Sequence, residues 1–89
     1  MSAQLRVLVV EDEPDLASVI AAYLRGETFD VDIAGTGPQA VTMAKDLRPD
    51  LVVLDIMLPG FDGLEVCRQL RTFTDCYVIM LTARDDEID

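Results

Sequence analysis

Histidine is absent from this 89-residue chain, and cysteine occurs only twice, as Cys67 and Cys76. The two cysteines form neither a CxxC pair nor a disulfide framework. We therefore expect both thiols to be reduced and to serve as small apolar side chains.

Long apolar runs and an excess of positive charge are also missing. No apolar stretch is long enough to cross a bilayer, and the amino terminus lacks the basic, apolar and cleavable parts of a signal peptide. We therefore expect a cytoplasmic protein with no membrane insertion. Seven basic and 17 acidic residues give a formal net charge of −10. This segment should not bind nucleic acid itself, because the phosphates would repel it.

The composition favours one small globular domain. Hydrophobic residues make up 51% of the chain and charged residues 27%, a balance that is typical of a folded protein. At this length the hydrophobic core can only be thin, so we expect marginal stability.

Short apolar runs rich in β-branched residues alternate with segments of helical periodicity. After the first run, Pro14 suits the first turn of a helix, Glu13 could cap it, and Gly26 suits its end. The pattern predicts strands at 5–10, 29–33, 51–54 and 77–81, and helices that begin near residues 14, 37 and 63. Apolar side chains at helical spacing predict the inner face of the first helix: Leu16, Val19, Ile20, Tyr23 and Leu24.

Strands that alternate with helices at short spacing predict βαβ units and a parallel α/β sheet. Segment 29–33 alternates apolar and charged residues, which is typical of a half-covered edge strand. The other three runs are strongly apolar and belong inside the sheet. The strand order 2-1-3-4 satisfies these conditions and places the topological switch point between the first and third strands.

The last predicted strand, at 77–81, is as apolar as a central strand, yet no later segment can flank it. An exposed apolar edge invites pairing with another chain. We therefore expect the sequence to lack at least one further strand and the helices that cover it. We also expect the open edge of 77–81 to allow pairing with a second copy of the chain.

Acidic residues follow two of the predicted central strands. Glu11 and Asp12 come directly after the first strand, and Asp55 closes the third, so the three side chains should converge at the switch point. Carboxylates placed so close repel one another unless a divalent cation lies between them. Oxygen ligands with no histidine or cysteine nearby suit Mg²⁺, and the backbone carbonyl of Met57 could add a further oxygen.

A carboxylate beside Mg²⁺ can attack a phosphoryl group, because the metal neutralises charge on the transferring oxygens. Thr82, at the end of the fourth strand, could donate its hydroxyl to a phosphoryl oxygen at Asp55. Each feature alone has an ordinary explanation: Glu11 and Asp12 as solvated charges at a helix start, and Thr82 as a strand-end residue. Their joint position at three neighbouring strand ends favours phosphoryl chemistry at Asp55.

Three segments of the chain resemble the signature of the response-regulator receiver domain: 9–13 (VVEDE), 54–63 (LDIMLPGFDG) and 81–84 (LTAR). The resemblance covers the chain from its first strand to its last residue. It implies a flavodoxin-like, doubly wound fold and one receiver domain over 1–89, incomplete at its carboxyl end. It also implies a two-component signalling module, phosphorylated on an aspartate by a sensor histidine kinase, and not an enzyme.

Carried over residue by residue, the resemblance implies that Asp55 is the phosphoacceptor and Thr82 the switch hydroxyl that turns toward the phosphoryl group. Asp12 would bind Mg²⁺ directly and Glu11 could do so through water. The Met57 backbone carbonyl would complete the set. The residues after Thr82 resemble receivers that precede a winged-helix DNA-binding domain, which implies a transcription regulator as the parent protein.

The chain also departs from the receiver pattern. A complete receiver has a fifth strand, preceded by a lysine that pairs with the phosphoryl group, and two more helices; the sequence ends before them. Its one lysine, Lys45, falls on the second predicted helix, away from the site. We therefore expect the chain to bind Mg²⁺ but to take up phosphate from acetyl phosphate poorly.

Two other classes of function remain open from the residues. A Mg²⁺-dependent phosphohydrolase with an aspartyl nucleophile would need a second acid two residues later to protonate the leaving group, and that position is Met57. A flavodoxin-like domain for a nucleotide or flavin would need a glycine-rich or hydroxyl-rich loop after the first strand. Glu11 and Asp12 would repel phosphate there.

Overall fold

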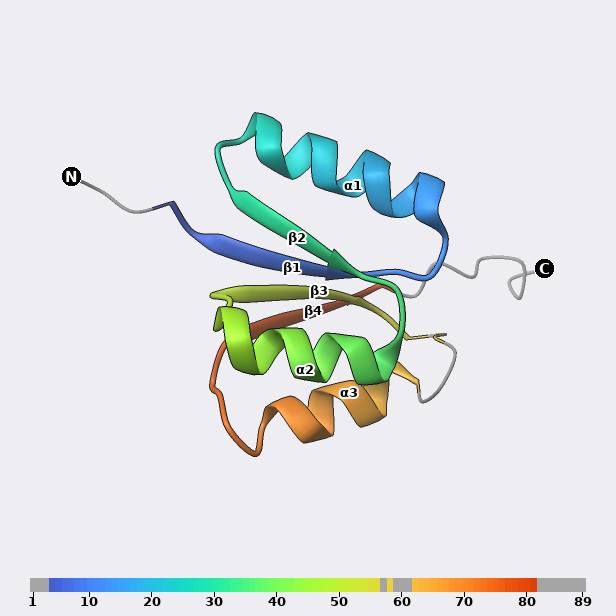
Figure 1. Cartoon of the computed structure of the whole chain (residues 1–89), viewed down its shortest axis with the longest axis vertical. Coiled ribbons are helices and arrows are strands. Elements are labelled where there is room, and N and C mark those ends of the chain that lie inside the picture. The colour runs from blue at the N-terminus through green and yellow to red at the C-terminus, as the bar shows by residue number, and fades with distance from the viewer. Residues whose placement is uncertain (1–3, 57, 59–61, 82–89) are drawn as a thin grey trace.

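The computed structural model describes residues 4–56, 58 and 62–81 of the chain. Within these residues, strands and helices alternate along the sequence (Figure 1). In chain order they are β1 (Arg6–Val10), α1 (Pro14–Gly26), β2 (Asp30–Ala34), α2 (Gly37–Leu47), β3 (Leu51–Asp55), α3 (Gly63–Leu70) and β4 (Tyr77–Leu81).

The strands form one parallel sheet in the order β2-β1-β3-β4. This confirms the predicted α/β class and the predicted strand order. β1 lies in the interior, with Val10 opposite Ala34 of β2 on one side and Leu54 of β3 on the other. β2 lies at the edge, where Val31 is buried and Asp30 is exposed, as its alternating pattern predicted.

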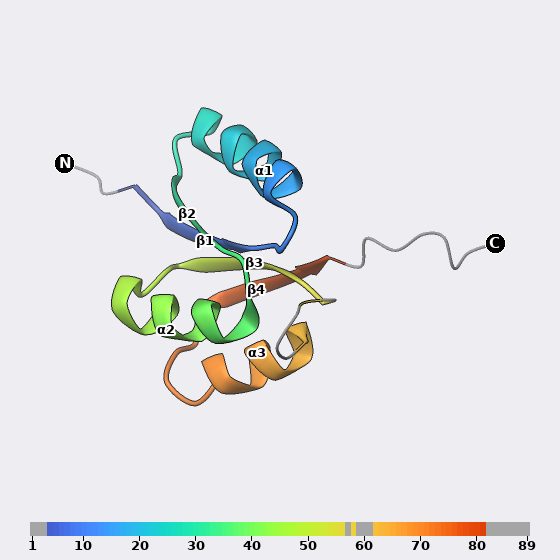
Figure 2. The same ribbon diagram turned by 45° about the vertical axis from the view of Figure 1, so that its right-hand side comes forward.

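Helices cover both faces of the sheet, with α1 on one face and α2 and α3 on the other (Figures 1 and 2). Successive side chains of a strand point to opposite faces. β1 therefore contributes Val7 and Val9 to the core on the α1 side, and Leu8 and Val10 to the core on the α2 and α3 side. All four side chains are buried, which explains why the strand is apolar from Val7 to Val10.

Both cysteines are free thiols, as predicted. Cys76 is buried in the core beside α2 and α3, and Cys67 is partly buried against the same core. They fill space among apolar side chains.

The buried face of α1 differs from the predicted one. Ala17 and Ala21 are buried, and Ile20 and Leu24 pack beside them against the sheet. The prediction counted only large apolar side chains and was right for Ile20 and Leu24, but it missed the two alanines that are the buried residues of the helix. The predicted members of the inner face that are exposed instead are Leu16, Val19 and Tyr23.

Short polar side chains cap two of the helices. Thr36 Oγ1 accepts a hydrogen bond from the Gln39 N–H at the start of α2, and Asp62 Oδ1 accepts one from the Glu65 N–H at the start of α3. Glu13 occupies the N-cap position of α1, as the sequence allowed, but its side chain makes no capping hydrogen bond. A short side chain reaches the amides of the first turn, which is why threonine and aspartate are preferred there.

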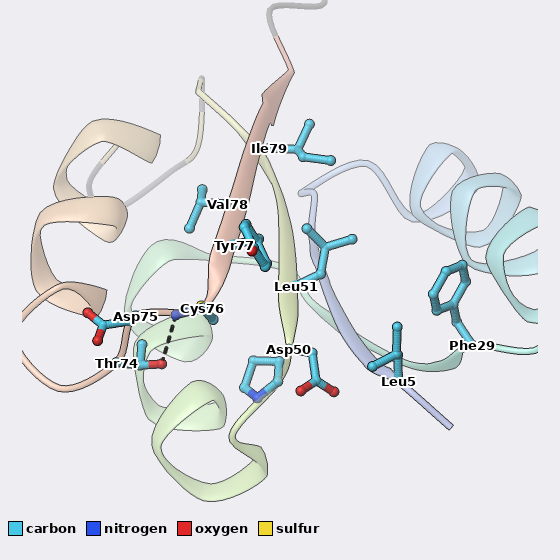
Figure 3. A pocket seen from close by; sticks show the side chains of 11 residues that line it. Leu5, Phe29, Asp50, Leu51, Thr74, Asp75, Cys76, Tyr77, Val78 and Ile79 are labelled. Carbon is cyan, nitrogen blue, oxygen red and sulfur yellow. Dashed lines mark hydrogen bonds between the residues drawn. The ribbon is translucent and has the colours of Figure 1, made fainter. Parts of the chain in front are cut away.

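β4 pairs with β3 and, among the residues that the structure describes, with no other strand. Its side chains Tyr77 and Ile79 are 79% and 51% exposed. With Leu51, Leu5 and other side chains they line an apolar cavity of about 780 Å³ (Figure 3). The prediction of an apolar strand with an uncovered side is thus confirmed for these residues. In the same described part of the chain, no helix has both the length and the apolarity to cross a membrane.

Candidate functional site

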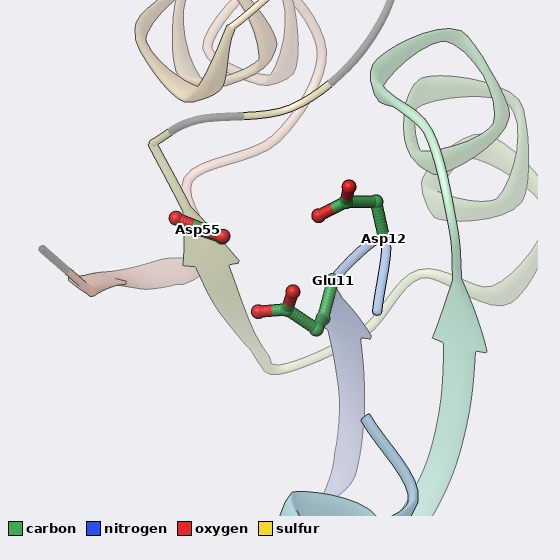
Figure 4. Close-up of side chains that lie close together, drawn as sticks. All are labelled: Glu11, Asp12 and Asp55. Carbon is green, nitrogen blue, oxygen red and sulfur yellow. The ribbon is translucent and has the colours of Figure 1, made fainter. Parts of the chain in front are cut away.

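The candidate site lies where β1 and β3 end side by side. Because Val10 and Leu54 are register partners, the next residues along the two strands reach the same edge of the sheet. Glu11, Asp12 and Asp55 each place a carboxylate oxygen there, and these oxygens lie within 4.8 Å of one another. Figure 4 shows the three side chains at the tips of the two strands. The predicted convergence of the three acids is therefore seen in the structure.

Two of the three carboxylates are buried. Glu11 is 4% exposed and Asp55 is 3% exposed, whereas Asp12 faces solvent. They are the two buried charged side chains of the described residues. Burying a carboxylate is costly unless hydrogen bonds or a cation compensate it.

The turn after β1 supplies part of that compensation for Glu11. Its Oε2 accepts a hydrogen bond from the backbone N–H of Glu13, with a distance of 3.1 Å between nitrogen and oxygen. Burial nevertheless raises the pKa of the Glu11 carboxyl, and the negative charge of Asp55 raises it further, while the bond from Glu13 lowers it. The site therefore disfavours the full negative charge of Glu11 as long as no cation is bound.

The donor set fits a hard divalent cation. All three donors are carboxylate oxygens, and they lie within 4.8 Å of one another. Ligands of one Mg²⁺, at about 2.1 Å from the metal, lie about 3 to 4 Å apart, so a small movement of these side chains would bring all three to one cation. Mg²⁺ is usually bound by few carboxylates together with several waters. The exposed Asp12 leaves the solvent side of the cluster accessible.

Ile56 and Gly63 lie beside the end of β3. The Gly63 N–H donates to the Ile56 carbonyl oxygen at 2.7 Å, and the Ile56 N–H lies 3.4 Å from the Leu81 carbonyl oxygen of β4. The predicted contributions of Met57 and Thr82 lie outside the described residues. The close approach of Gly63 to β3 was not predicted from the sequence, where its one signal is the Asp62-Gly63 pair at the start of α3.

Lys45 is not at the site, as the sequence predicted. Its Nζ lies 5.5 Å from the centre of the Phe73 ring. These two side chains help to line a polar cavity of about 380 Å³ beside α2. The larger apolar cavity is lined by residues at the amino ends of the strands, such as Leu5 and Asp50, at the edge opposite the acids. Neither cavity contains a residue of the acidic cluster.

Comparison with known sequences identifies a family. The profile of the response regulator receiver domain matches residues 7–89. The chain is 51% identical over 84 residues to the DNA-binding response regulator MtrA of Mycolicibacterium smegmatis. It is 43% identical over 84 residues to the transcriptional regulatory protein BaeR of Escherichia coli. These alignments include 94% of this chain but only 37% and 35% of the relatives, so the chain spans little more than a third of their length.

Solved structures agree with the sequence comparison. The activated (BeF3) N-terminal receiver domain of Klebsiella pneumoniae RstA superposes with a TM-score of 0.85 at 40% identity, over 93% of this chain and 71% of that one. The receiver domain of a sensor histidine kinase from Pseudomonas aeruginosa, solved with a magnesium ion coordinated in its active-site cleft, gives a TM-score of 0.86 at 35% identity. That match includes 93% of this chain and 70% of the other.

Proposed function

This chain belongs to the response-regulator receiver family of two-component signalling, and from that premise we propose that Asp55 is its phosphoacceptor and that Glu11 and Asp12 hold Mg²⁺ beside it. Receivers are signalling domains and not catalytic enzymes. The observation that carries the proposal is the convergence of three carboxylates from two strand ends within 4.8 Å.

The chemistry of the proposed transfer is simple. One carboxylate oxygen of Asp55 attacks the phosphorus of a phosphohistidine, a P–O bond forms, and the P–N bond to the kinase breaks, with its electron pair remaining on the imidazole. Bound Mg²⁺ supplies neutralisation of the charge on the transferring oxygens. The position of Asp55 at the end of an interior strand supports this role, because the paired strand holds its main chain in place.

Asp12 and Glu11 have different roles in the proposed site. Asp12 is exposed and can bind the cation directly, as a carboxylate that already faces water. Glu11 is buried and its Oε2 is held by the Glu13 N–H, which suits a fixed charge that orients the metal or one of its waters. A cation beside Glu11 would also offset the cost of its buried charge.

Two further roles are proposed from the sequence motifs alone. The backbone carbonyl of Met57 is a further metal ligand, and the hydroxyl of Thr82 bonds to the phosphoryl group and acts as the switch. Their motif positions support this: Met57 follows the phosphoacceptor by two residues, and Thr82 comes directly after β4, the strand beside β3.

The parent protein is proposed to be a cytoplasmic transcription regulator with a winged-helix DNA-binding output domain. Two relatives that match this chain are a DNA-binding response regulator and a transcriptional regulatory protein, both much longer than the chain. The phosphoryl donor is a sensor histidine kinase. The acidic receiver segment itself, with a net charge of −10, leaves DNA contact to the output domain.

We also propose that the 89-residue chain associates with a second copy through the edge of β4. The exposed Tyr77 and Ile79 support this, because an uncovered apolar edge strand offers both backbone hydrogen-bonding groups and apolar area to a partner.

Beryllofluoride with Mg²⁺, a mimic of the bound phosphoryl group, tests the proposal. In an NMR titration of the Mg²⁺-loaded chain we expect beryllofluoride to shift the amide signals of Glu11, Asp12 and Asp55 further, and D55N to show no such added response. Without Mg²⁺, beryllofluoride should shift none of these signals. Acetyl phosphate should label the chain slowly. A response that is equal in D55N would refute Asp55 as the acceptor, and fast stoichiometric labelling would refute the expectation of poor uptake.

A further inference from the structure

Gly63, the first residue of α3, lies directly against the main chain of Asp55. A Cβ atom at position 63 would lie 2.7 Å from the Asp55 carbonyl oxygen and 2.7 Å from the Ile56 Cα. These distances are far below van der Waals contact. The φ angle of Gly63 is outside the left-handed region, so this position requires glycine for space and not for backbone freedom.

Neither β3 nor α3, the two elements that meet at Gly63, can easily move to make room for a side chain. On one side, Asp55 ends β3, which pairs with β1 and β4. On the other side, α3 is anchored in the core by Val66 and Leu70, both fully buried. A methyl group at position 63 would therefore displace the end of β3 or the connection that follows it.

Hydrogen bonds fix both ends of the contact. The Gly63 N–H donates to the Ile56 carbonyl oxygen at 2.7 Å, and the Asp62 side chain caps α3 by accepting from the Glu65 N–H at 3.0 Å. The first bond joins the residue after Asp55 to the first residue of α3. It can form at this length only while position 63 has no side chain that pushes the two main chains apart.

We propose that Gly63 is a positioning residue, whose missing side chain sets the distance between the Asp55 carboxylate and those of Glu11 and Asp12. This inference rests on the proposed function, because it concerns the same metal and phosphoryl site. Gly63 contacts neither group and acts through the main chain of Asp55. A Cβ there moves the acceptor relative to the two acids on the turn after β1.

The chain offers a matched control for the substitution. Gly26, the last residue of α1, has no atom within 4 Å of a Cβ placed on it. Gly26→Ala therefore adds the same methyl group without a clash. A second control is Asp62→Ala, which removes the cap of α3 but adds no atoms against β3.

The test is a Mg²⁺ titration of the chain by NMR, at a temperature where circular dichroism shows each variant to be folded. We expect Gly26→Ala and Asp62→Ala to keep the parent midpoint, and Gly63→Ala to need about tenfold more Mg²⁺. In the metal-free spectra, only Gly63→Ala should shift the Asp55 and Ile56 amides. An equal midpoint for Gly63→Ala and the parent, or an equal loss in Asp62→Ala, would overturn the proposal.

If the proposed metal and phosphoryl site is itself wrong, the same titration gives a different result. In that case the parent chain itself shows no Mg²⁺-dependent shifts at Glu11, Asp12 and Asp55. If Gly63→Ala is unfolded in buffer, the titration is repeated in trimethylamine N-oxide, which favours the compact state. A variant that stays unfolded there would make Gly63 a requirement of the fold and not of the site, and would also overturn the proposal.

Discussion

The side chain of Glu11 accepts a hydrogen bond from the backbone of Glu13, two residues later, at 3.1 Å. This bond folds the acidic turn back on itself and holds a buried carboxylate beside Asp55. The contact uses the main chain of Glu13, whose side chain makes no capping hydrogen bond to α1. The turn therefore orients the acidic site and gives the helix no side-chain cap.

Glu11→Gln should separate stability from metal binding. The amide oxygen can still accept from the Glu13 N–H, but the buried negative charge is gone. Since burial raises the pKa of Glu11 in the folded chain, we expect the metal-free variant to be more stable than the parent and its Mg²⁺ affinity to fall by about tenfold. Urea unfolding with and without Mg²⁺ measures both effects. A variant that is less stable without metal would contradict this reading of Glu11.

Asp12→Asn should remove the metal response and leave the metal-free stability nearly unchanged, because Asp12 is exposed. For the parent chain, Mg²⁺ at ten times its dissociation constant should add about 1.4 kcal/mol to the free energy of unfolding. Asp46→Asn makes the same change of charge on an exposed position of α2 and should keep the full response. If both variants respond to Mg²⁺ alike, direct binding by Asp12 is wrong.

Because of the Glu65–Arg68 pair on α3, we expect the free energy of unfolding to fall slightly in acid. Hydrogen bonds from Arg68 and Gln69 hold the pKa of Glu65 at about 2, below its ordinary value of 4.5. The folded state therefore gains stability from this carboxylate above about pH 4.5, and loses the gain as the pH falls toward 2. Solvent screens the pair, so the effect should be small and should shrink with added salt.

Acid unfolding of Glu65→Gln gives the measurement. Between pH 4.5 and pH 2 the stability difference between the parent and the variant should narrow. A constant difference across that window would show that the pair contributes nothing through ionisation.

Ile79→Lys should abolish self-association through β4. The side chain is half exposed beside Tyr77, and a lysine at a sheet edge opposes pairing with another strand. Gel filtration over a concentration series should show the parent chain shifting to a larger species and the variant remaining a monomer. Val19→Lys replaces an equally apolar, exposed side chain on α1 and serves as the control. If the parent chain is a monomer at every concentration, the proposed contact through β4 is wrong.

Much of the fold could be predicted because its interior strands are unambiguous. A run such as Leu51–Asp55, apolar and then charged, allows little except a buried strand that ends at the sheet edge. The alternation of Val31 with its charged neighbours placed β2 at the edge for the same reason. Strand order and the meeting of the acids then followed from topology.

The details that escaped prediction depend on close packing. The inner face of α1 is built on Ala17 and Ala21, and a search for large apolar side chains misses alanines that lie close on the sheet. The main chain of Gly63 lies close to that of Asp55, which precedes it by eight residues. The spacing of apolar residues along a sequence carries no information on such a distance. The contributions of Met57 and Thr82 stay predictions.

The interior position of β1 has a consequence for the length of that strand. One residue inserted between Arg6 and Val10 would turn every following side chain to the opposite face. Each apolar side chain after the insertion would point into the core on the other face of the sheet. The acidic turn would lie about 3.3 Å beyond the end of β3. The number of residues in this strand therefore matters as much to the proposed phosphorylation site as the carboxylates that follow it.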